Sequence, residues 1–571
     1  MKSFELLFSP IQIRNVTLPN RIALASHTTK LGSPEGYVTD KMIRYYSERA
    51  KGGTGLITVE LTAVEKRGRH RTRALCLYDD SFIPGLKKLC SEIKKYGSKL
   101  AIQLAHGGME CTSRSTGGIQ PIAPSYIKLP VYDDGIFEIV EAKEATKKDI
   151  EEIELNFLKA ARRSKEAGFD MIEIHGAHAY LIGQFLSPLF NKRTDEYGGD
   201  VKNRSRLAVE IIEMIKNEIK DLPVIFRISG DEFTEGGLTI KDTIKICKFI
   251  EDAGADVIHV SAGVTYAPLY TVQPMNFPEG VLIPLAAAIK KEVSIPVMAV
   301  GRIHDPFLAE NTLREGKADI IAMTRQLIAD PEWPRKVREG RLSEIRKCLS
   351  CNTCIDRMRM GLGVQCAINP AAGREEEFLD EVTKSPKKVM VIGGGPAGMQ
   401  AAIILAKRGH KVVLYEANRL GGQLCTAARM PVFQNVIAKE EIITTFIEYL
   451  KNQVKQSGIS IVLKKATLKE IEKENPDLIV VATGAKYKNM LIKYLLIPLL
   501  SSNISKRYAH IFLRLKKKFG SNIFHLLRKP NDDIIQDILI SRKNFLKVGD
   551  CNKLGETVDA VYDAAFKSSH I

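Results

Sequence analysis

The amino-acid sequence predicts an α/β protein in which an N-terminal (β/α)8 TIM barrel precedes a four-cysteine segment and a Rossmann-like dinucleotide-binding domain. Three observations lead to this prediction. Eight apolar, β-branched runs alternate with amphipathic stretches up to about residue 340, four cysteines gather between positions 348 and 366, and a glycine-rich turn follows an apolar run near residue 390. A chain of 571 residues is long enough for about three to four domains.

The eight apolar runs are too hydrophobic for strands with one solvated face, so they predict parallel strands buried on both sides. They lie at 21–26, 54–60, 100–104, 170–177, 224–229, 256–263, 297–303 and 319–326. Helix-period stretches separate most of them, for example at 147–168. Eight such alternations predict a closed barrel, and a doubly wound open sheet is the alternative.

Polar side chains follow these strands at the end where a barrel carries its chemistry. Gln103 offers a donor and an acceptor to the edge of a heterocycle, and Arg227 adds a positive charge. Glycine and arginine after the last two strands suit a phosphate that an arginine fork can bind. Each residue alone is also typical of a structural polar group at a barrel rim, but their joint placement favours a binding site. The candidates are Ser26, Glu60, Gln103, Arg227, Gly301, Arg302, Thr324 and Arg325.

The segment EIHGAHAYLIGQF, which begins at residue 173, carries the sharpest catalytic pattern. His175 and His178 close the fourth strand and Tyr180 follows them. Two imidazoles can polarise a carbonyl oxygen, and a phenol with a pKa of about 10 can donate a proton. A metal pair is the alternative. It would need a third ligand and an orienting carboxylate, and Glu173 alternates to the opposite side of the strand from His178.

Residues 1–345 resemble the old yellow enzyme family of FMN-dependent ene reductases. The matching stretches are LFSPIQIRNVTLPNRIALAS, GLITVE, AIQLAHGG, FRISGDE, VGRI, MTRQLIADPEWP and the segment 173–199. The resemblance implies an FMN at the C-terminal face of the barrel, with Gln103 and Arg227 against its isoalloxazine ring. It places the phosphate against Gly301, Arg302, Thr324 and Arg325.

The same resemblance assigns the catalytic residues. It implies that His175 and His178 hold the substrate oxygen and that Tyr180 donates the proton. If Tyr180 is not the acid, Tyr266 is the next candidate.

The segment 346–373 holds four cysteines in the spacing C-x2-C-x2-C-x11-C. Zinc is one alternative, but zinc ribbons use two separated C-x2-C pairs. Three close cysteines and a remote fourth are typical of an iron–sulfur cluster. The four candidate metal ligands are Cys348, Cys351, Cys354 and Cys366.

The order of barrel, cluster and dinucleotide fold resembles the larger members of the old yellow enzyme family. These include 2,4-dienoyl-CoA reductase, clostridial enoate reductase, bile-acid ene reductases and trimethylamine dehydrogenase. The resemblance implies a [4Fe–4S] cluster that relays single electrons between two flavins.

A charged linker is expected at 374–388, and the first part of an FAD-binding dinucleotide fold at 389–487. Gly393, Gly395 and Gly398 follow an apolar strand and open a helix whose N-terminus would face a pyrophosphate. A second strand ends at an acidic residue, Glu416, where ribose hydroxyls bind.

Three further stretches, GGQL, IVVATGA and KVGDC, resemble the FAD-binding elements of two-dinucleotide-fold flavoproteins. They imply FAD rather than NAD at this site. They add Gln423 and Asp550 to the candidate cofactor-binding residues, and Asp550 belongs to a last FAD-binding element at 547–571.

The stretch 488–546 departs from the family pattern. The resemblance implies a whole NADH-binding fold there, whereas this stretch has one glycine, Gly520, and no GxGxxG. Residues 488–547 hold thirteen Lys and Arg against three Asp, which is +10 of the net charge of +17. We expect a lost or eroded NADH module. A poorly packed remnant is favoured over a basic amphipathic helix for a membrane or partner.

Composition excludes several other classes of protein. The charge excess is local and no nucleic-acid motif appears, so nucleic-acid binding is not expected. No apolar run is long enough for a membrane span, and MKSFELLFSP lacks the features of a signal peptide. The other six cysteines are scattered, so we expect a cytoplasmic protein rather than a secreted disulfide scaffold.

We therefore expect an oxidoreductase that takes electrons from NADH or NADPH and reduces an activated C=C bond of a small enoate, enone or enoyl-CoA-type substrate. Electrons would pass from FAD through the cluster to FMN. An amine dehydrogenase of the trimethylamine dehydrogenase type is one alternative. The lone tryptophan, Trp333, lies beyond strand eight, and His175 is a tyrosine in the amine-oxidising relatives. An electron-transfer flavoprotein fed by a partner is another, and homo-oligomerisation stays open.

Overall fold

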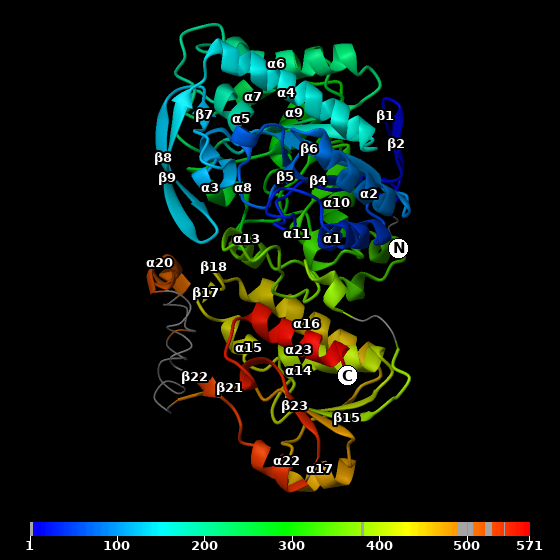
Figure 1. Ribbon diagram of the computed structural model, residues 1–571. Helices are drawn as coiled ribbons and strands as arrows, with labels where there is room; N and C mark the ends of the chain where they lie inside the picture. The colour runs from blue at the N-terminus through cyan, green and yellow to red at the C-terminus, as the bar shows by residue number, and fades with distance from the viewer. Residues whose placement is uncertain (1–3, 379–381, 489–499, 501–505, 520–527, 542) are drawn as a thin grey trace.

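The structure is a computed structural model that describes residues 4–378, 382–488, 500, 506–519, 528–541 and 543–571. Figure 1 shows two bodies, a larger one coloured blue to green and a smaller one coloured yellow to red. The cysteine segment lies between them, and both bodies contact it. Asp356 accepts a hydrogen bond from Asn435 of the smaller body (2.7 Å), and the backbone oxygen of Arg359 accepts one from Gly135 of the larger body (3.0 Å).

Eight parallel strands form a closed barrel in the larger body, which confirms the predicted fold over the open-sheet alternative. The ring closes because the first strand pairs with both the second and the last. The strands are buried on both sides, which explains their continuous apolar sequences. They are β3 (Ile22–Leu24), β4 (Leu56–Ala63), β6 (Lys99–Ala105), β10 (Met171–Gly176), β11 (Val224–Ser229), β12 (Val257–Ser261), β13 (Val297–Ala299) and β14 (Ile320–Met323).

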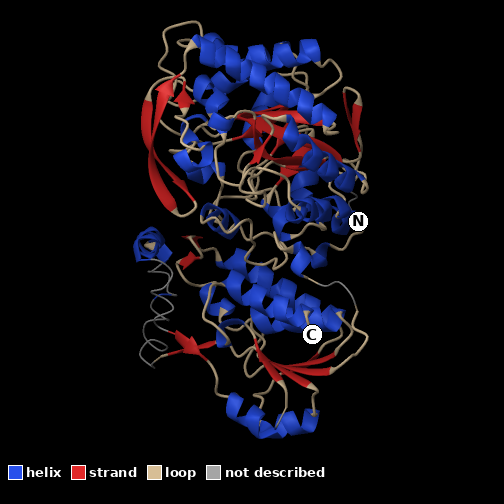
Figure 2. Ribbon diagram, in the orientation of Figure 1, coloured by secondary structure: helices blue, strands red, loops and turns tan. Residues whose placement is uncertain are grey.

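Helices surround this ring in Figure 2. The longest, α4 (Lys147–Glu166), begins at a capping box formed by Thr146 and Asp149, and its apolar stripe, which includes Ile153 and Phe157, is buried. The other helices around the barrel with at least six residues are α1 (Asp40–Lys51), α2 (Ile83–Lys94), α5 (Leu181–Leu186), α6 (Val201–Glu218), α7 (Ile240–Asp252), α9 (Ile283–Lys290), α10 (Pro306–Arg314) and α12 (Trp333–Arg338); α13 (Thr353–Arg359) belongs to the cysteine segment.

The seventh strand is shorter than predicted. The apolar run 297–303 predicts a strand throughout, but β13 ends at Ala299. Gly301 and Arg302 adopt φ values of 120° and 55°, which no strand residue has, so the chain turns away there.

Two β-hairpins lie outside the eight-stranded barrel, and neither was among the strands predicted from the sequence. β1 (Ile11–Ile13) pairs with β2 (Val16–Leu18), and β8 (Ile127–Asp133) pairs with β9 (Ile136–Glu144), which also pairs with β7 (Ile122–Ala123). Asp134 and Gly135 form the second turn with φ values of 51° and 77°. An Asp-Gly turn between alternating residues is a strong hairpin signal, so this element was readable from the sequence.

The smaller body contains a five-stranded parallel sheet. Its strands lie in the order β19 (Ser460–Val462), β16 (Lys411–Tyr415), β15 (Lys388–Ile392), β20 (Leu478–Val481) and β23 (Phe545–Lys547). Three helices lie on the side facing the barrel and two on the far side (Figures 1 and 2). The first group is α14 (Pro396–Lys407), α16 (Glu440–Gln456) and α23 (Thr557–Ser569); the second is α17 (Leu468–Glu474) and α22 (Ile535–Ser541).

The stretch 488–546 lies partly outside the described residues. Its described part contains α20 (Ala509–Phe519), which packs against the hairpin β17 (Val432–Phe433) and β18 (Val436–Ile437). It also contains β22 (Arg528–Pro530), which pairs antiparallel with β21 (Ala485–Tyr487). No second parallel sheet occurs in this described part.

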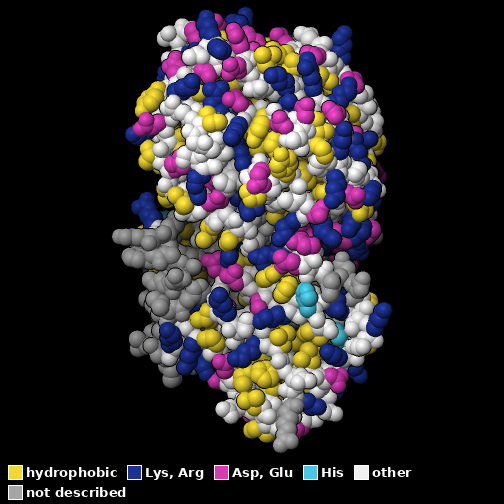
Figure 3. Space-filling view, viewed as in Figure 1, with side chains coloured by type: hydrophobic (Ala, Val, Ile, Leu, Met, Phe, Trp, Pro, Cys, Tyr) yellow, Lys and Arg dark blue, Asp and Glu magenta, His cyan; other side chains and the backbone are white. Residues whose placement is uncertain are grey.

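Two further observations concern the charge of the surface and the hydropathy of the helices. On the face shown in Figure 3, Lys and Arg side chains are interspersed with Asp and Glu. Among the described helices, none is both long and apolar enough to cross a bilayer.

Candidate active site and cofactor sites

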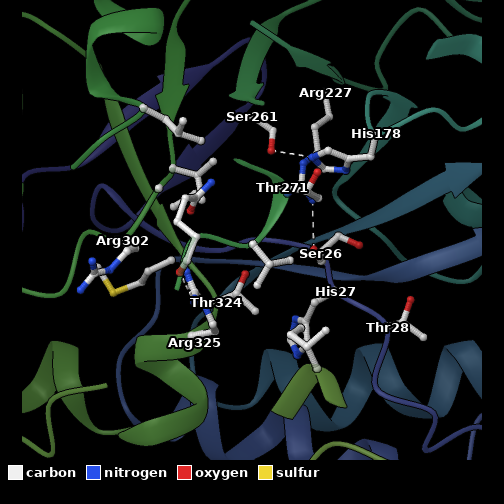
Figure 4. A pocket seen from close by; sticks show the side chains of 18 of the residues that line it. Ser26, His27, Thr28, His178, Arg227, Ser261, Thr271, Arg302, Thr324 and Arg325 are labelled. Carbon is white, nitrogen blue, oxygen red and sulfur yellow. Dashed lines mark hydrogen bonds between the residues drawn. The ribbon is translucent and has the colours of Figure 1, made fainter. Parts of the chain in front are cut away.

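A cavity lies at the C-terminal ends of the barrel strands, where the predicted site residues converge (Figure 4). Ten of the eleven barrel residues singled out from the sequence line it. They are Ser26, Gln103, His175, His178, Tyr180, Arg227, Gly301, Arg302, Thr324 and Arg325. They come from strands far apart in the sequence, so only the closed barrel brings them together.

Glu60 is the exception, because it does not line the cavity. Its side chain is fully buried, and its Oε2 accepts hydrogen bonds from the backbone nitrogen (3.0 Å) and the hydroxyl of Thr29. Burial raises the pKa of Glu60 to about 7. It anchors the segment after β3, and a direct contact between Glu60 and a cofactor stays a prediction.

The two histidines and Tyr180 form one end of the cavity. The ring centroids of His175 and Tyr180 lie 4.8 Å apart, and those of His175 and His178 lie 5.2 Å apart. His178 and Ala179 have φ values of 60° and 62°, so the chain turns sharply after β10 and returns Tyr180 to the same cavity. The Nε2 of His178 lies 2.7 Å from the hydroxyl of Ser261, which fixes its ring.

Burial sets the protonation of these groups. It lowers the pKa of His175 and of His178 well below the ordinary value, and the nearby Arg227 adds to the effect. Both imidazoles are therefore neutral, and each offers one N–H donor. Burial raises the pKa of Tyr180 to about 12, which keeps its hydroxyl protonated. The Tyr180 ring meets His70 edge-on, with centroids 5.4 Å apart.

A buried hydrogen-bond network lies beneath the middle of the cavity. The amide of Gln103 donates to Glu173 (2.7 Å) and accepts from the hydroxyl of Ser26 (2.9 Å). Glu173 also lies 2.6 Å from Nδ1 of His259. Burial would raise the pKa of Glu173, but His259 and Arg227 hold it below its ordinary value, so the carboxylate is ionised.

Two polar side-chain atoms, in Arg227 and His175, which line the cavity, have no hydrogen-bond partner among the described residues. Arg227 donates from Nη1 to the backbone oxygen of Ser26 (3.0 Å), yet its Nε is buried and unbonded. Nδ1 of His175 is likewise buried and unbonded. Because buried polar atoms are normally satisfied, these two mark a place for a bound polar molecule. A heterocycle with donors and acceptors on its edge fits this requirement.

Two arginines form the opposite end of the cavity. Burial lowers the pKa of Arg302, and the positive charge of the nearby Arg325 lowers it further. Arg302 donates to the Ser350 hydroxyl (3.1 Å), and Arg325 donates to the Asn352 side chain (2.7 Å). A Cβ at Gly301 would lie 2.7 Å from Leu282, so only glycine fits this turn. Paired guanidinium groups with room beside them suit a phosphate.

The cavity also has walls that the sequence did not indicate. The segment 271–273 lines it from the loop 264–282, and His304 and Ile355 complete the wall near the cysteine segment. No motif marks these positions, and they enter only through the fold. Tyr266, the alternative acid, is 55% exposed, stacks on Phe190 and does not line the cavity.

The four cysteines gather next to the arginine end of the cavity. Burial raises the pKa of Cys354 well above the usual value of a thiol, and Cys366, Cys348 and Cys351 add to this effect, so the four sulfurs are neighbours. Among the described residues, no group of three or more His, Cys, Asp or Glu side chains is arranged around a single metal ion. A single zinc would need every sulfur at about 2.3 Å from one point.

The glycine-rich turn of the smaller body has a distinct reason for each glycine. A Cβ at Gly398 would lie 1.8 Å from the backbone oxygen of Gly393, and a Cβ at Gly393 would lie 2.3 Å from that of Ala482. Those two glycines allow close packing of strand and helix. A Cβ at Gly395 would have no neighbour within 4 Å, and α14 begins there without a side-chain cap. A helix N-terminus without a side-chain cap suits a pyrophosphate.

The acidic and amide residues expected to bind the dinucleotide lie around this turn. The Glu416 carboxylate accepts hydrogen bonds from the backbone nitrogens of Gly394 (2.6 Å) and Asn418 (2.8 Å). Asp550 pairs with Arg528 at 2.9 Å, and Arg528 also approaches the Gln423 oxygen at 3.4 Å. No motif around Arg528 predicts this position.

Comparison with protein families divides the chain in the same way as the fold. Residues 6–344 match the NADH:flavin oxidoreductase / NADH oxidase family, and residues 388–504 match the FAD dependent oxidoreductase family.

Relatives with different activities resemble most of the chain. It is 43% identical to an NADH oxidase of Thermoanaerobacter brockii over 85% of this chain and 74% of that protein. It is 35% identical to an N,N-dimethylglycine/sarcosine dehydrogenase of Chromohalobacter salexigens (85% and 70%) and 34% identical to a cinnamate reductase of Clostridium sporogenes (86% and 76%). A solved 2-naphthoyl-CoA reductase superposes over the full length of both chains with a TM-score of 0.89 and 25% identity.

Proposed function

The chain belongs to the NADH:flavin oxidoreductase / NADH oxidase family, in its multidomain old yellow enzyme branch, and we propose that it reduces an activated C=C bond next to a carbonyl group. It is an FMN-dependent oxidoreductase with a second, FAD-dependent unit. The observation that carries the proposal is the meeting of two neutral imidazoles and one protonated phenol in a single buried cavity.

In this proposal the two histidines bind the substrate and the tyrosine supplies the proton. His175 and His178 are neutral, so each can donate one hydrogen bond to a carbonyl oxygen without placing a charge in the cavity. Such bonds draw electron density toward the oxygen and make the β-carbon of an enoate, enone or enoyl thioester electrophilic. The Tyr180 hydroxyl stays protonated and can then protonate the α-carbon.

The cavity fits an FMN in this proposal. Gln103 and Arg227 would bind the edge of the isoalloxazine, because the Nε of Arg227 lacks a partner and the Gln103 amide keeps one N–H and one lone pair free for a further bond. Arg302 and Arg325 would bind the phosphate, with Thr324 and Gly301 beside them.

Cys348, Cys351, Cys354 and Cys366 would hold a [4Fe–4S] cluster. The four thiols lie close enough to influence one another, and three closely spaced cysteines with a remote fourth favour a cluster, in which each sulfur binds a different iron, over zinc. The turn from Gly393 to Gly398 and Glu416 would hold FAD. When bound, the two flavins and the cluster supply hydride and single-electron transfer, with NADH or NADPH as the donor.

An amine dehydrogenase is the second candidate, because a sarcosine-oxidising relative is as similar as the cinnamate reductase. An alkylammonium substrate favours an aromatic cage. Trp333, however, is fully buried, donates to the backbone oxygen of His304 (3.1 Å) and does not line the cavity. The reductase therefore has more support than the dehydrogenase.

The first test is composition followed by a substrate screen. Anaerobically purified protein should contain about one FMN, one FAD and four irons per chain. Dithionite-reduced protein should be reoxidised by enones, enoates or enoyl-CoA thioesters, and the oxidised protein should not be reduced by secondary or tertiary amines. Stoichiometric zinc without iron would contradict the cluster, and reduction of the oxidised protein by sarcosine-type amines would favour the second candidate.

A further inference from the structure

Arg528 lies where the loops of the predicted FAD site meet. Its Nη1 donates to Oδ2 of Asp550 at 2.9 Å and lies 3.4 Å from Oε1 of Gln423. Its Nη2 lies 3.5 Å from the backbone oxygen of Gly555. The side chain is mostly buried, with 18% of its surface exposed. One guanidinium thus joins two loops that are far apart in the sequence, although it comes from the stretch in which we expected an eroded remnant.

Backbone pairing fixes the position of Arg528. Strand β22 pairs with β21 in a register that places Arg528 opposite Tyr487. Beyond that strand, the Asn531 nitrogen donates to the Gly484 oxygen (3.1 Å), and the Thr483 hydroxyl donates to the Asn531 oxygen (2.6 Å). Arg528 is therefore attached directly after β20, at the C-terminal edge of the parallel sheet. Ligands of open α/β sheets bind at this edge.

The two loops that Arg528 contacts both lie against the start of α14. A Cβ at Gly549, next to Asp550, would lie 2.7 Å from the Ala397 side chain. A Cβ at Gly422, next to Gln423, would lie 3.0 Å from the Cα of Gly395. The guanidinium therefore contacts two loops that both lie against the uncapped N-terminus of α14.

Charge balance calls for a cation at this place. A pyrophosphate diester brings two negative charges, and the site already holds the carboxylates of Glu416 and Asp550. The N-terminus of α14 offers only about half a positive charge. A guanidinium has the fork geometry that matches phosphate oxygens. We propose that Arg528 binds the pyrophosphate of FAD, so that the basic stretch contributes a phosphate ligand to the FAD site; this rests on the FAD assignment made above.

The test compares three variants of the full chain. Arg528→Ala removes the guanidinium, Arg528→Lys keeps a charge without the fork, and Lys529→Ala is the matched control. Lys529 follows Arg528 on the same strand, is exposed, and points to the opposite face. Flavins are extracted from each protein and the FAD-to-FMN ratio is measured by chromatography. FAD affinity is then measured by titration of FAD-depleted protein, and ADP binding by calorimetry.

We expect Arg528→Ala to weaken FAD and ADP binding by about 10- to 100-fold, the effect of one charge-assisted hydrogen-bonded contact. Arg528→Lys should lie between that variant and the unsubstituted protein. Lys529→Ala should stay within about twofold, and the FMN content should be the same in all four proteins. A steeper salt dependence of FAD binding in the unsubstituted protein than in Arg528→Ala would also support a phosphate contact.

Two results would overturn the proposal. Unchanged FAD and ADP affinity in Arg528→Ala would leave Arg528 as a structural partner of Asp550 only. Tighter binding in that variant would mean that the ion pair obstructs the site. If the unsubstituted protein keeps FMN but binds no FAD, the FAD assignment itself fails, and this outcome is distinct from the other two.

Discussion

The barrel cavity and the dinucleotide loop, by which we mean the predicted FAD-site residues Gln423, Arg528 and Asp550, each place arginine where a phosphate is expected, but they balance that charge in opposite ways. In the barrel, Arg302 and Arg325 donate to neutral groups, the Ser350 hydroxyl and the Asn352 amide, and no described carboxylate lies within ion-pair distance of either. In the dinucleotide loop, Arg528 is paired with Asp550.

The barrel site can therefore bind a phosphate in the arrangement that the folded protein already has, whereas at Arg528 the ion pair with Asp550 must change when a phosphate binds. At the barrel site, Arg302 and Arg325 bring positive charge without a paired carboxylate among the described residues, so an anion enters without displacing a charged partner. At the loop, an incoming pyrophosphate must share the guanidinium with Asp550. We therefore expect the barrel cofactor to bind more tightly than the dinucleotide, and four predictions test this contrast.

The largest effect is expected at the barrel site. Tyr180→Phe removes the proposed proton donor while the ring keeps its packing, so reoxidation of dithionite-reduced protein by an enone should slow about 10²- to 10⁴-fold. FMN content and flavin reduction should be unchanged. Tyr266→Phe is the control, because Tyr266 is exposed and does not line the cavity. Full turnover by Tyr180→Phe would show that another acid acts.

The second prediction concerns the entry of hydride. Among the described residues of 488–547 no second parallel sheet is present, and the prediction rests on the expectation from the sequence that the NADH-binding fold is lost there. Correct positioning is worth about 10²-fold in rate, so NADH should reduce FAD at least that much more slowly than FMN, if it reduces FAD at all. Stopped-flow mixing that follows the two flavins separately measures this, and dithionite serves as the reference reductant. Fast, saturable reduction of FAD by NADH would contradict this prediction and would show that a nicotinamide site is present near the FAD.

The third prediction concerns the strength of the barrel phosphate site. Arg302→Ala should weaken FMN binding about 10- to 100-fold, since one charge-assisted contact is lost. The FAD-to-FMN ratio should rise accordingly. Arg335→Ala removes an exposed arginine that lies outside the cavity and should leave the ratio unchanged. Equal retention of FMN in both variants would remove the phosphate role from Arg302.

The smallest effect is expected from pH. The pKa of Tyr180 is raised to about 12, so the phenol stays protonated as pH rises from 7 to 9. The pKa values of His175 and His178 are lowered, so both imidazoles are neutral throughout this range. The rate of enone reduction by the pre-reduced protein should therefore change less than about threefold between pH 7 and 9. A tenfold fall over this range would mean that a group with an ordinary pKa controls the step.

Much of the barrel site could be predicted from sequence because barrel topology fixes where strand ends meet. Once the eight apolar runs are placed, Gln103, His175 and Arg227 have to surround one cavity. Glu60 shows the limit of that logic, because a strand residue can point toward a buried loop instead of the cavity. The pattern in the sequence does not distinguish these two orientations.

The rest depended on contacts between distant segments. The wall at 271–273 comes from a loop without periodicity or motif, so only its packing against the barrel reveals it. Arg528 lies in a stretch that looked like an eroded remnant, and its partner Asp550 follows it by more than twenty residues. The hairpin at Asp134 and Gly135 differs from both, because its Asp-Gly turn between alternating residues is a local pattern that indicates a hairpin.

The hydrogen bonds that join the cysteine segment to Arg302 and Arg325 have a consequence for the assembly of the protein with its cofactors. Ser350 and Asn352 stand between Cys348 and Cys354, and both have φ values near those of the left-handed region, 50° and 58°. Anything that orders this segment also orders Arg302 and Arg325, so binding of the proposed cluster should raise FMN affinity, and FMN should raise the affinity for the cluster by the same factor. Exposure to air would then strip both groups together, and assembly in the cell would proceed in a coupled order.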